Sequence, residues 1–121
     1  MKKVALMIIP ALICGILFTS CDKEHATKEE EINKTLKNTE SYYETFVVGD
    51  EEGAIIKVQA MHYEKSELIR DESTNFNAQY HYKTIADFVG KDYVVIEVHK
   101  NKTGIGPVEI ETVKFNFTIT K

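Results

Sequence analysis

The sequence contains no tryptophan and only two cysteines, Cys14 and Cys21, both near its amino terminus. Beyond Cys21 the chain has no thiol for a disulfide or for nucleophilic catalysis, so an apolar core must hold the fold together. The lack of tryptophan disfavours a sugar-binding platform, in which aromatic rings stack on pyranose faces. Basic residues are also few, since 15 Lys and Arg stand against 19 Asp and Glu. This excess of acid disfavours nucleic acid as a partner.

Residues 1–20 have the layout of a secretory signal peptide. Two basic residues, Lys2 and Lys3, precede an apolar run from Val4 to Phe18, and small residues follow it. The run is about 15 residues long, whereas a membrane-spanning helix needs about 20. We therefore expect residues 1–20 to be a cleaved export signal and the protein to act outside the cytoplasm.

The end of this segment, Leu17-Phe18-Thr19-Ser20-Cys21, resembles the lipobox of bacterial lipoproteins. The resemblance implies that the Cys21 thiol receives a diacylglyceryl group and that cleavage leaves Cys21 as the new amino terminus. Several acyl chains, such as palmitate, anchor a protein far more firmly than one chain does. The resemblance thus implies a lipid-anchored protein of the bacterial cell envelope, on the periplasmic or surface face of the outer membrane. The alternative is an ordinary cleaved signal that leaves Cys21 as a thiol.

Residues 21–40 are almost entirely polar and are expected to form the lipidated tether. Part of this segment carries helical signals: Thr27 and Glu30 make a capping-box pattern, and Ile32 and Leu36 are spaced to share one helix face. The pattern predicts a short, marginal helix over about residues 28–37. This helix either docks on the domain through its two large apolar residues or frays into a flexible tether.

From Ser41 onward, polar and apolar residues alternate with a period of two, as is typical of β-strands. Residues 41–48 and 54–58 flank the polar loop Gly49–Gly53, and this arrangement predicts a hairpin. The second strand is expected to continue to Tyr63 and to be followed by an edge strand over residues 67–70 and a polar loop. Its shared face would consist of Ile56, Val58, Ala60 and His62.

Three further strands are predicted in the carboxyl-terminal half. The strongest alternation covers residues 76–84, and residues 93–99 form a compact apolar segment expected at the centre of a sheet. A glycine-rich loop then leads into the last strand, over residues 108–120. The side chains expected to point inward are Phe76, Ala78, Tyr80, Tyr82 and Thr84 in the first of these strands and Val113, Phe115, Phe117 and Ile119 in the last.

Five or six strands joined by short polar loops, with no helical stretch between them, favour antiparallel pairing over βαβ units. We therefore predict a single mainly β domain over residues 41–121, either an antiparallel β-sandwich of the immunoglobulin-like type or a small barrel. The alternative is a cystatin-like α+β fold, in which a helix over residues 29–38 packs on an antiparallel sheet through Ile32 and Leu36.

No motif for catalysis is present in the sequence. The serines lie in no nucleophile elbow, and no two histidines have the close spacing of a structural zinc site. His62, His81 and His99 fall on separate predicted strands, where they could converge as zinc ligands, although solvent-facing strand histidines explain them more simply. We therefore predict neither an enzyme nor a metal or cofactor site.

The tyrosines are the remaining candidates for function, because tyrosine combines a flat apolar ring with a polar tip and is enriched in protein interfaces. The predicted function is a lipid-anchored binding module that contacts another envelope or extracellular protein as an inhibitor, an immunity factor or an accessory subunit. A lipoprotein that binds a small molecule or a glycan is the alternative. The candidate binding residues are Tyr63, Tyr80, Tyr82 and Tyr93.

Overall fold

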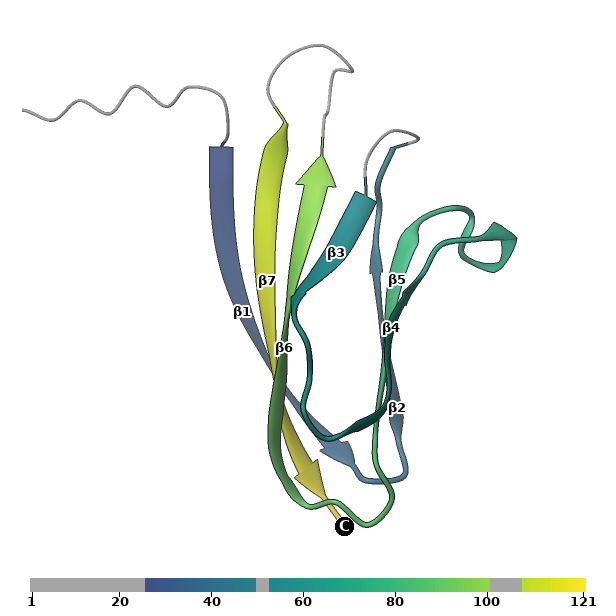
Figure 1. Ribbon diagram of the computed structural model, residues 1–121, viewed down its shortest axis with the longest axis vertical. Coiled ribbons are helices and arrows are strands. Elements are labelled where there is room, and N and C mark those ends of the chain that lie inside the picture. Colours follow the sequence, from purple (N-terminus) through teal and green to yellow (C-terminus); the bar gives the residue numbers. More distant parts are fainter. Residues whose placement is uncertain (1–25, 50–52, 101–107) are drawn as a thin grey trace, which may run out of the picture.

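The computed structural model describes residues 26–49, 53–100 and 108–121, and these form a β-sandwich of two separate sheets (Figure 1). The order of strands is β1-β7-β6-β3 in the four-stranded sheet and β2-β5-β4 in the three-stranded sheet. The predicted β-sandwich is confirmed, and the sheets do not close into a barrel. The strands are β1 (Ala26–Lys37), β2 (Ser41–Phe46), β3 (Gly53–Val58), β4 (Tyr63–Ile69), β5 (Ala78–Thr84), β6 (Gly90–Lys100) and β7 (Glu109–Thr120), and a 3₁₀ turn covers Glu72–Thr74.

The core lies between β5 of one sheet and β6 and β7 of the other. Alternate residues of these strands are buried, as their period of two predicts. Aromatic rings meet across the two layers: Tyr82 stacks on Phe117 with ring centroids 4.2 Å apart, and Tyr80 faces Phe115 at 6.2 Å. The expected inward set of β7 is confirmed, because its four members Val113, Phe115, Phe117 and Ile119 are all buried.

The helix expected over residues 28–37 is wrong, because Ala26–Lys37 is strand β1. It pairs in parallel with the whole of β7, from Ala26 opposite Glu109 to Lys37 opposite Thr120. Ile32 and Leu36 are four residues apart, a spacing that puts them on one face of a helix but equally on one face of a strand. Both pack against the core, and this burial together with the backbone ladder outweighs the weak helical propensity of a short charged segment.

Because residues 26–37 form a strand, the expected domain boundary and the cystatin-like alternative are both wrong. The β-domain includes the residues from Ala26 onward, where a tether up to Glu40 was expected. The cystatin-like alternative also fails, because the described parts of the chain contain no α-helix to pack on a sheet. The sandwich is not wholly antiparallel either, since the β1–β7 pair is parallel whereas the other four strand pairs are antiparallel.

The hairpin expected from residues 41–58 is also wrong. β2 pairs with β5 and β3 pairs with β6, so the connection between them crosses from one sheet to the other. Alternation shows which face of a strand is buried but not which strand it pairs with. Residues 50–52 of this connection and 101–107 of the glycine-rich loop lie outside the described residues.

Smaller differences concern strand ends. The edge position expected for residues 67–70 is confirmed, but the strand, β4, begins earlier, at Tyr63. Ile56, Val58, Ala60 and His62 do not form one strand face, because β3 ends at Val58. Phe76 is exposed and has a positive φ of 59°, so it belongs to the turn before β5 and not to the inward face of that strand.

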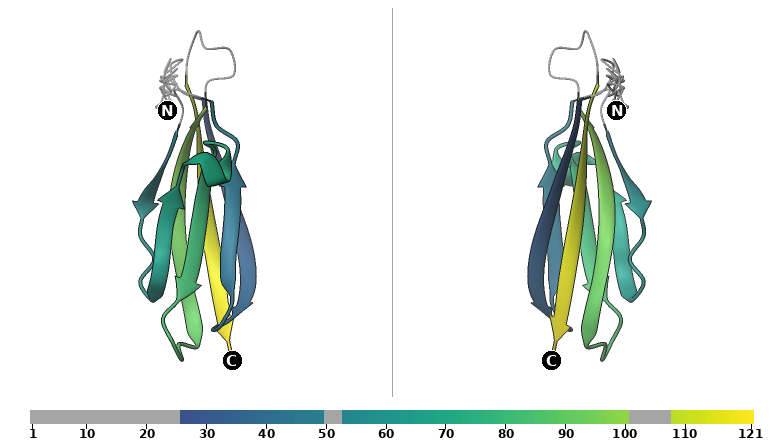
Figure 2. Two further views of the ribbon diagram at one scale, coloured as in Figure 1. Left: turned by 90° about the vertical axis from the view of Figure 1, so that its right-hand side faces the viewer. Right: turned by 90° about the vertical axis from the view of Figure 1, so that its left-hand side faces the viewer.

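The sandwich has two ends with different chain connections. β1 begins at one end, which we call the proximal end, and Lys121 lies at the other, the distal end (Figures 1 and 2). The distal end carries the connections between β1 and β2, between β3 and β4 and between β5 and β6, namely residues 38–40, 59–62 and 85–89. Any attachment through the amino-terminal segment therefore enters the domain at the proximal end.

Leu36→Ala tests whether β1 is part of the folded domain. We expect the free energy of unfolding to fall by about 2–5 kcal/mol, because a buried leucine is replaced by a smaller side chain that leaves a cavity. Thr35→Ala, which changes the exposed neighbour in the same strand, is the control and should alter stability by less than about 0.5 kcal/mol. Equal urea denaturation midpoints for Leu36→Ala and the parent would show that the segment is a tether after all.

Candidate functional site

The four candidate tyrosines do not form one surface. Tyr80 and Tyr82 are fully buried in the sandwich core, where burial raises the pKa of both phenols above its ordinary value. Their expected role as binding residues is therefore incompatible with this fold, and they act as core residues. Tyr63 and Tyr93 are 39% and 41% exposed, but they belong to β4 and β6, which lie in different sheets.

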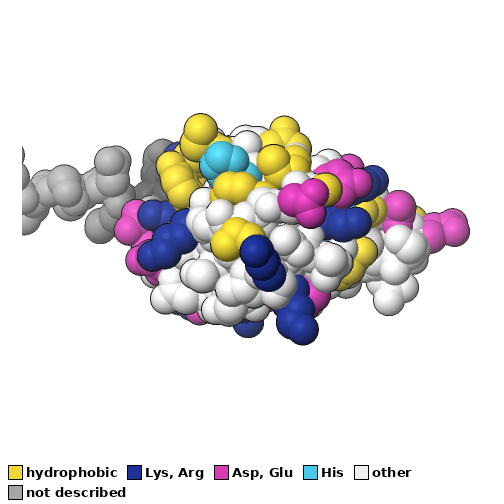
Figure 3. Space-filling view, turned by 90° about the horizontal axis from the view of Figure 1, so that it is seen from below, with side chains coloured by type: hydrophobic (Ala, Val, Ile, Leu, Met, Phe, Trp, Pro, Cys, Tyr) yellow, Lys and Arg dark blue, Asp and Glu magenta, His cyan; other side chains and the backbone are white. Residues whose placement is uncertain are grey.

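Apolar side chains gather instead at the distal end, on two neighbouring loops. Met61 is 77% exposed, Val89 50% and Ile85 43%, and the half-buried His62 and Phe88 lie between them in the chain. We call these five residues the distal apolar tip. Figure 3, which views the molecule from below, shows hydrophobic side chains collected around a histidine on this end. Single exposed apolar residues are ordinary, but a group of them indicates a contact surface.

The two loops of the distal apolar tip are fastened to each other. The His62 ring stacks on the Phe88 ring, with centroids 4.2 Å apart and planes 12° from parallel. The His62 carbonyl oxygen accepts hydrogen bonds from the Ile85 amide, at 3.1 Å, and from the Thr84 hydroxyl, at 2.7 Å. The tip is therefore a fixed shape and not a pair of independent loops.

The Asp92 side chain fixes one loop of the distal apolar tip to the core. Its carboxylate, in a residue only 5% exposed, accepts hydrogen bonds of 2.9 Å from the backbone amides of Met61, His62 and Tyr93. The Tyr82 hydroxyl donates a fourth bond, also of 2.9 Å. A buried carboxylate is costly unless it is fully hydrogen-bonded, and these four donors meet that need. The result is a rigid link between the core and the loop that presents Met61.

The sequence carries a signal for Asp92 that the strand predicted over residues 93–99 leaves out. The strand begins at Gly90, and Asp92 alternates with Val94 and Ile96 on the buried face. A charged residue in register with apolar core positions must have specific partners, which makes it a candidate for a structural or functional role.

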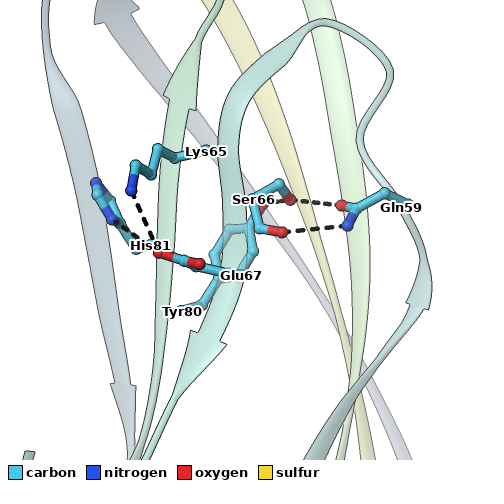
Figure 4. A network of polar contacts seen from close by, with 6 residues as sticks. All are labelled: Gln59, Lys65, Ser66, Glu67, Tyr80 and His81. Carbon is cyan, nitrogen blue, oxygen red and sulfur yellow. Dashed lines mark hydrogen bonds and ion pairs between the residues drawn. The ribbon is translucent and has the colours of Figure 1, made fainter.

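The second polar network lies on the three-stranded sheet (Figure 4). His81 stacks on Tyr43 at 4.3 Å, and its Nδ1 lies 3.9 Å from a Glu67 carboxylate oxygen that is also 3.9 Å from the Lys65 ammonium. Burial lowers the pKa of His81 below its ordinary value, although Glu67 acts in the opposite direction. His81 Nε2 is buried and has no hydrogen-bond partner among the described residues. This histidine is therefore packed mainly as an uncharged ring.

The hydroxyl of Ser66 links the segment after β3 to the core. It donates to the side-chain oxygen of Gln59, at 2.5 Å, and lies 2.6 Å from the Tyr80 hydroxyl. The Gln59 amide in turn donates to the Ser66 carbonyl, at 3.1 Å. Neither an amide nor a phenol with a raised pKa can serve as a general base for a serine, so these contacts fasten the segment after β3 to β4.

The three histidines predicted on separate strands do not converge. His62 is in the distal apolar tip, His81 is in β5, and His99 in β6 bonds Glu97 at 2.7 Å. Within residues 26–49, 53–100 and 108–121, no group of three His, Cys, Asp or Glu side chains is placed to hold a metal ion. The lipidation predicted at Cys21 concerns a residue outside these ranges.

No helix in the described parts of the chain is long and apolar enough to cross a membrane.

The comparisons with known proteins identify no relative by sequence: no family model and no curated protein matches this chain. Among solved structures, the chain is similar to an endo-fucoidan hydrolase from glycoside hydrolase family 107, with 13% identity and a TM-score of 0.46 over 75% of this chain and 13% of the hydrolase. It is also similar to a cysteine protease inhibitor from Entamoeba histolytica, with 6% identity and a TM-score of 0.44 over 79% of this chain and 95% of the inhibitor.

A third similar structure is a 2,6-sialyltransferase from Photobacterium, with 14% identity and a TM-score of 0.41 over 77% of this chain and 18% of the enzyme. The chain thus spans less than a fifth of the length of the two enzymes. These low scores carry no argument about activity, so function is argued from this chain's own residues.

Asp92→Ala tests whether the carboxylate supports the distal apolar tip. We expect the free energy of unfolding to fall by about 3 kcal/mol or more, because each buried donor left without an acceptor costs about 1–3 kcal/mol. The amides of Met61 and His62 should also lose protection in hydrogen-exchange NMR, since both donate to this carboxylate. Tyr82→Phe removes only one of the four bonds and should cost less. Equal losses from the two variants, or unchanged amide protection in Asp92→Ala, would contradict this role.

Proposed function

We propose that this chain is a lipid-anchored binding module of the bacterial cell envelope, and that it contacts another envelope or extracellular protein through the distal apolar tip. The observation that carries the proposal is the exposed, apolar and internally fastened tip at one end of a small sandwich. A protein-facing role accounts for apolar side chains that a solvated loop does not need.

The rigidity of the tip favours binding. The stacked His62 and Phe88 rings and the bonds to the Asp92 carboxylate order the tip before any partner arrives. Association then costs little further conformational entropy, which is the usual advantage of a preorganised surface. Exposed Met61 supplies a flexible apolar side chain that adapts to the contours of a partner.

The position of the tip also fits an anchored protein. Only five peptide units separate Cys21 from Ala26, so a lipid on Cys21 can lie at most about 18 Å from the start of β1, at up to ~3.6 Å per residue. β1 begins at the proximal end, and the tip is at the distal end (Figure 1). An anchor of this length leaves the proximal end near the lipid surface and the distal apolar tip directed away from it.

The surroundings of the tip indicate the chemistry of the partner. The exposed side chains beside it carry both signs, because Lys91 follows Val89 closely whereas Asp87 precedes Phe88. A surface of mixed charge around an apolar centre has the usual organisation of a protein interface, with an apolar core and a polar rim. The complementary surface is an apolar depression on a partner protein, into which the two loops fit.

Val89→Asp tests the contact. A charge at the centre of the tip should reduce recovery of a specific partner from detergent-solubilised envelopes at least about tenfold, the effect of about 1.4 kcal/mol in binding. Met61→Asp, on the other loop, should have the same effect. Val47→Asp is the matched control, since Val47 is 75% exposed and follows β2 at the proximal end. Circular dichroism checks the fold of each variant. Capture that survives both tip substitutions but not Val47→Asp would place the contact elsewhere.

Cys21→Ala tests the anchor separately. If Cys21 carries the lipid, the alanine variant should move from the membrane fraction to the soluble fraction, because several acyl chains supply most of the membrane affinity. Cys14→Ala is the matched control and should stay membrane-bound. Mass spectrometry of the mature amino terminus provides a direct measurement. A Cys21→Ala protein that remains as firmly attached as the parent would exclude lipid anchoring at this residue while leaving the role of the tip open.

A further inference from the structure

A groove of about 590 Å³ crosses the outer face of the four-stranded sheet near the distal end. Its volume is within the ~300–1,000 Å³ typical of small-ligand sites. Strand β1 contributes one wall and the segment after β3 contributes the other, with β7 and β6 between them. The side chains that matter for recognition are Glu31, Asn33, Met61, Lys91, Tyr93 and Asn116.

The polar side of the groove is held in position by cross-strand hydrogen bonds. The Asn116 side-chain amide donates to a Glu31 carboxylate oxygen at 2.5 Å and to the Asn33 side-chain oxygen at 3.1 Å. Strand pairing puts Asn33 directly opposite Asn116, and Asn116 directly opposite Tyr93. In this arrangement the second oxygen of Glu31 and the amide nitrogen of Asn33 have no further partner among the described residues. They present an acceptor and a donor side by side to a ligand.

Charged groups of both signs line the groove. Glu31 supplies one exposed carboxylate, and Lys91 supplies one exposed ammonium group. The pairing register places Glu31 opposite Lys114 and Lys91 opposite Thr118, so the backbone positions of Glu31 and Lys91 are offset by about 13 Å along the strands. The third charged group, Asp92, is buried and fully used by its internal bonds. Such a lining favours neither a phosphate nor a free cation.

The remaining lining is partly apolar, because Met61, Tyr93 and Phe117 line the groove together with His62 and Thr118. The Tyr93 side chain lines the groove and is partly exposed, and the Lys114 ammonium lies over its ring, 4.7 Å from the ring centroid. The exposed Met61 side chain forms the wall beyond it. A ligand that fits both sides of this groove has hydroxyl groups that donate and accept hydrogen bonds, an apolar face and no net charge.

We propose that this groove binds a short neutral saccharide, held mainly by hydrogen bonds to Glu31, Asn33 and Asn116 and by contact with the Tyr93 ring. Recognition rests on the hydrogen-bonded side chains of Glu31, Asn33 and Asn116 rather than on an aromatic platform. This is consistent with a chain that lacks tryptophan. The groove is open and its contacts are partly solvated, so the affinity is expected to be in the millimolar range. The groove adjoins the interface assigned to the distal apolar tip, because Met61 and His62 belong to the tip and also line the groove.

Side-chain amide NMR of the full-length chain in detergent micelles tests the proposal. The probes are maltose, lactose, cellobiose and N,N′-diacetylchitobiose, each at about 10 mM, roughly ten times a Kd of 1 mM. We expect at least one of them to shift the side-chain amide resonances of Asn33 and Asn116. Asn33→Ala and Asn116→Ala should each raise the apparent Kd about fivefold, the size of one neutral hydrogen bond.

Thr112→Ala is the matched control, because Thr112 lies on the same strand as Asn116 but lines a different depression. It should leave the titration unchanged. The proposal is overturned if none of the four sugars shifts these amides, or if both asparagine variants bind as the parent does. It is also overturned if trialanine or Gly-Lys-Gly shifts the same amides at lower concentration, since the groove is then a peptide site. The Asn116→Ala variant should still recover the protein partner of the distal apolar tip. Loss of sugar binding can therefore be told apart from loss of that protein interface.

Discussion

Contact between the aromatic face of β5 and that of β7 is the interaction on which the rest of the molecule depends. Tyr80 and Tyr82 meet Phe115 and Phe117 across the two sheets, with no disulfide within the described chain to reinforce them. These rings are the largest fully buried side chains of the described residues, so their burial contributes strongly to the stability of the core. The Tyr82 hydroxyl also donates a hydrogen bond to the Asp92 carboxylate. The same core residue therefore helps to order the distal loops.

The parts of the fold that could be predicted are those set by local period. Alternation in residues 78–84 and 113–119 identified the buried faces correctly, because a strand with one apolar side has only one stable orientation on a core. Strand pairing was not readable in the same way. β2 and β3 look like a hairpin in sequence, yet each finds its partner in a different sheet. Ile32 and Leu36 fit both a helix and a strand, and only the ladder offered by β7 decides between them.

The candidate sites were harder to predict than the core, for a physical reason. The alternation predicts that Tyr80 and Tyr82 point inward, but residue type alone also makes them candidates for binding. An aromatic ring with one hydroxyl is buried readily when that hydroxyl finds a partner, as Tyr80 does with Ser66. The distal apolar tip combines residues from two loops more than 20 positions apart in the chain, and no local pattern links Met61 to Ile85. The groove likewise joins β1 to β6 through β7, a pairing that sequence spacing does not reveal.

The parallel pairing of β1 with β7 has a consequence for the time at which the domain can fold. The first strand of the domain lies beside the last, so the four-stranded sheet lacks its edge until residue 120 has been synthesised. Contacts between such remote segments raise the contact order and delay folding. For the exported lipoprotein proposed above, this delay is an advantage, because the sheet forms only after the last strand has followed the rest of the chain across the membrane.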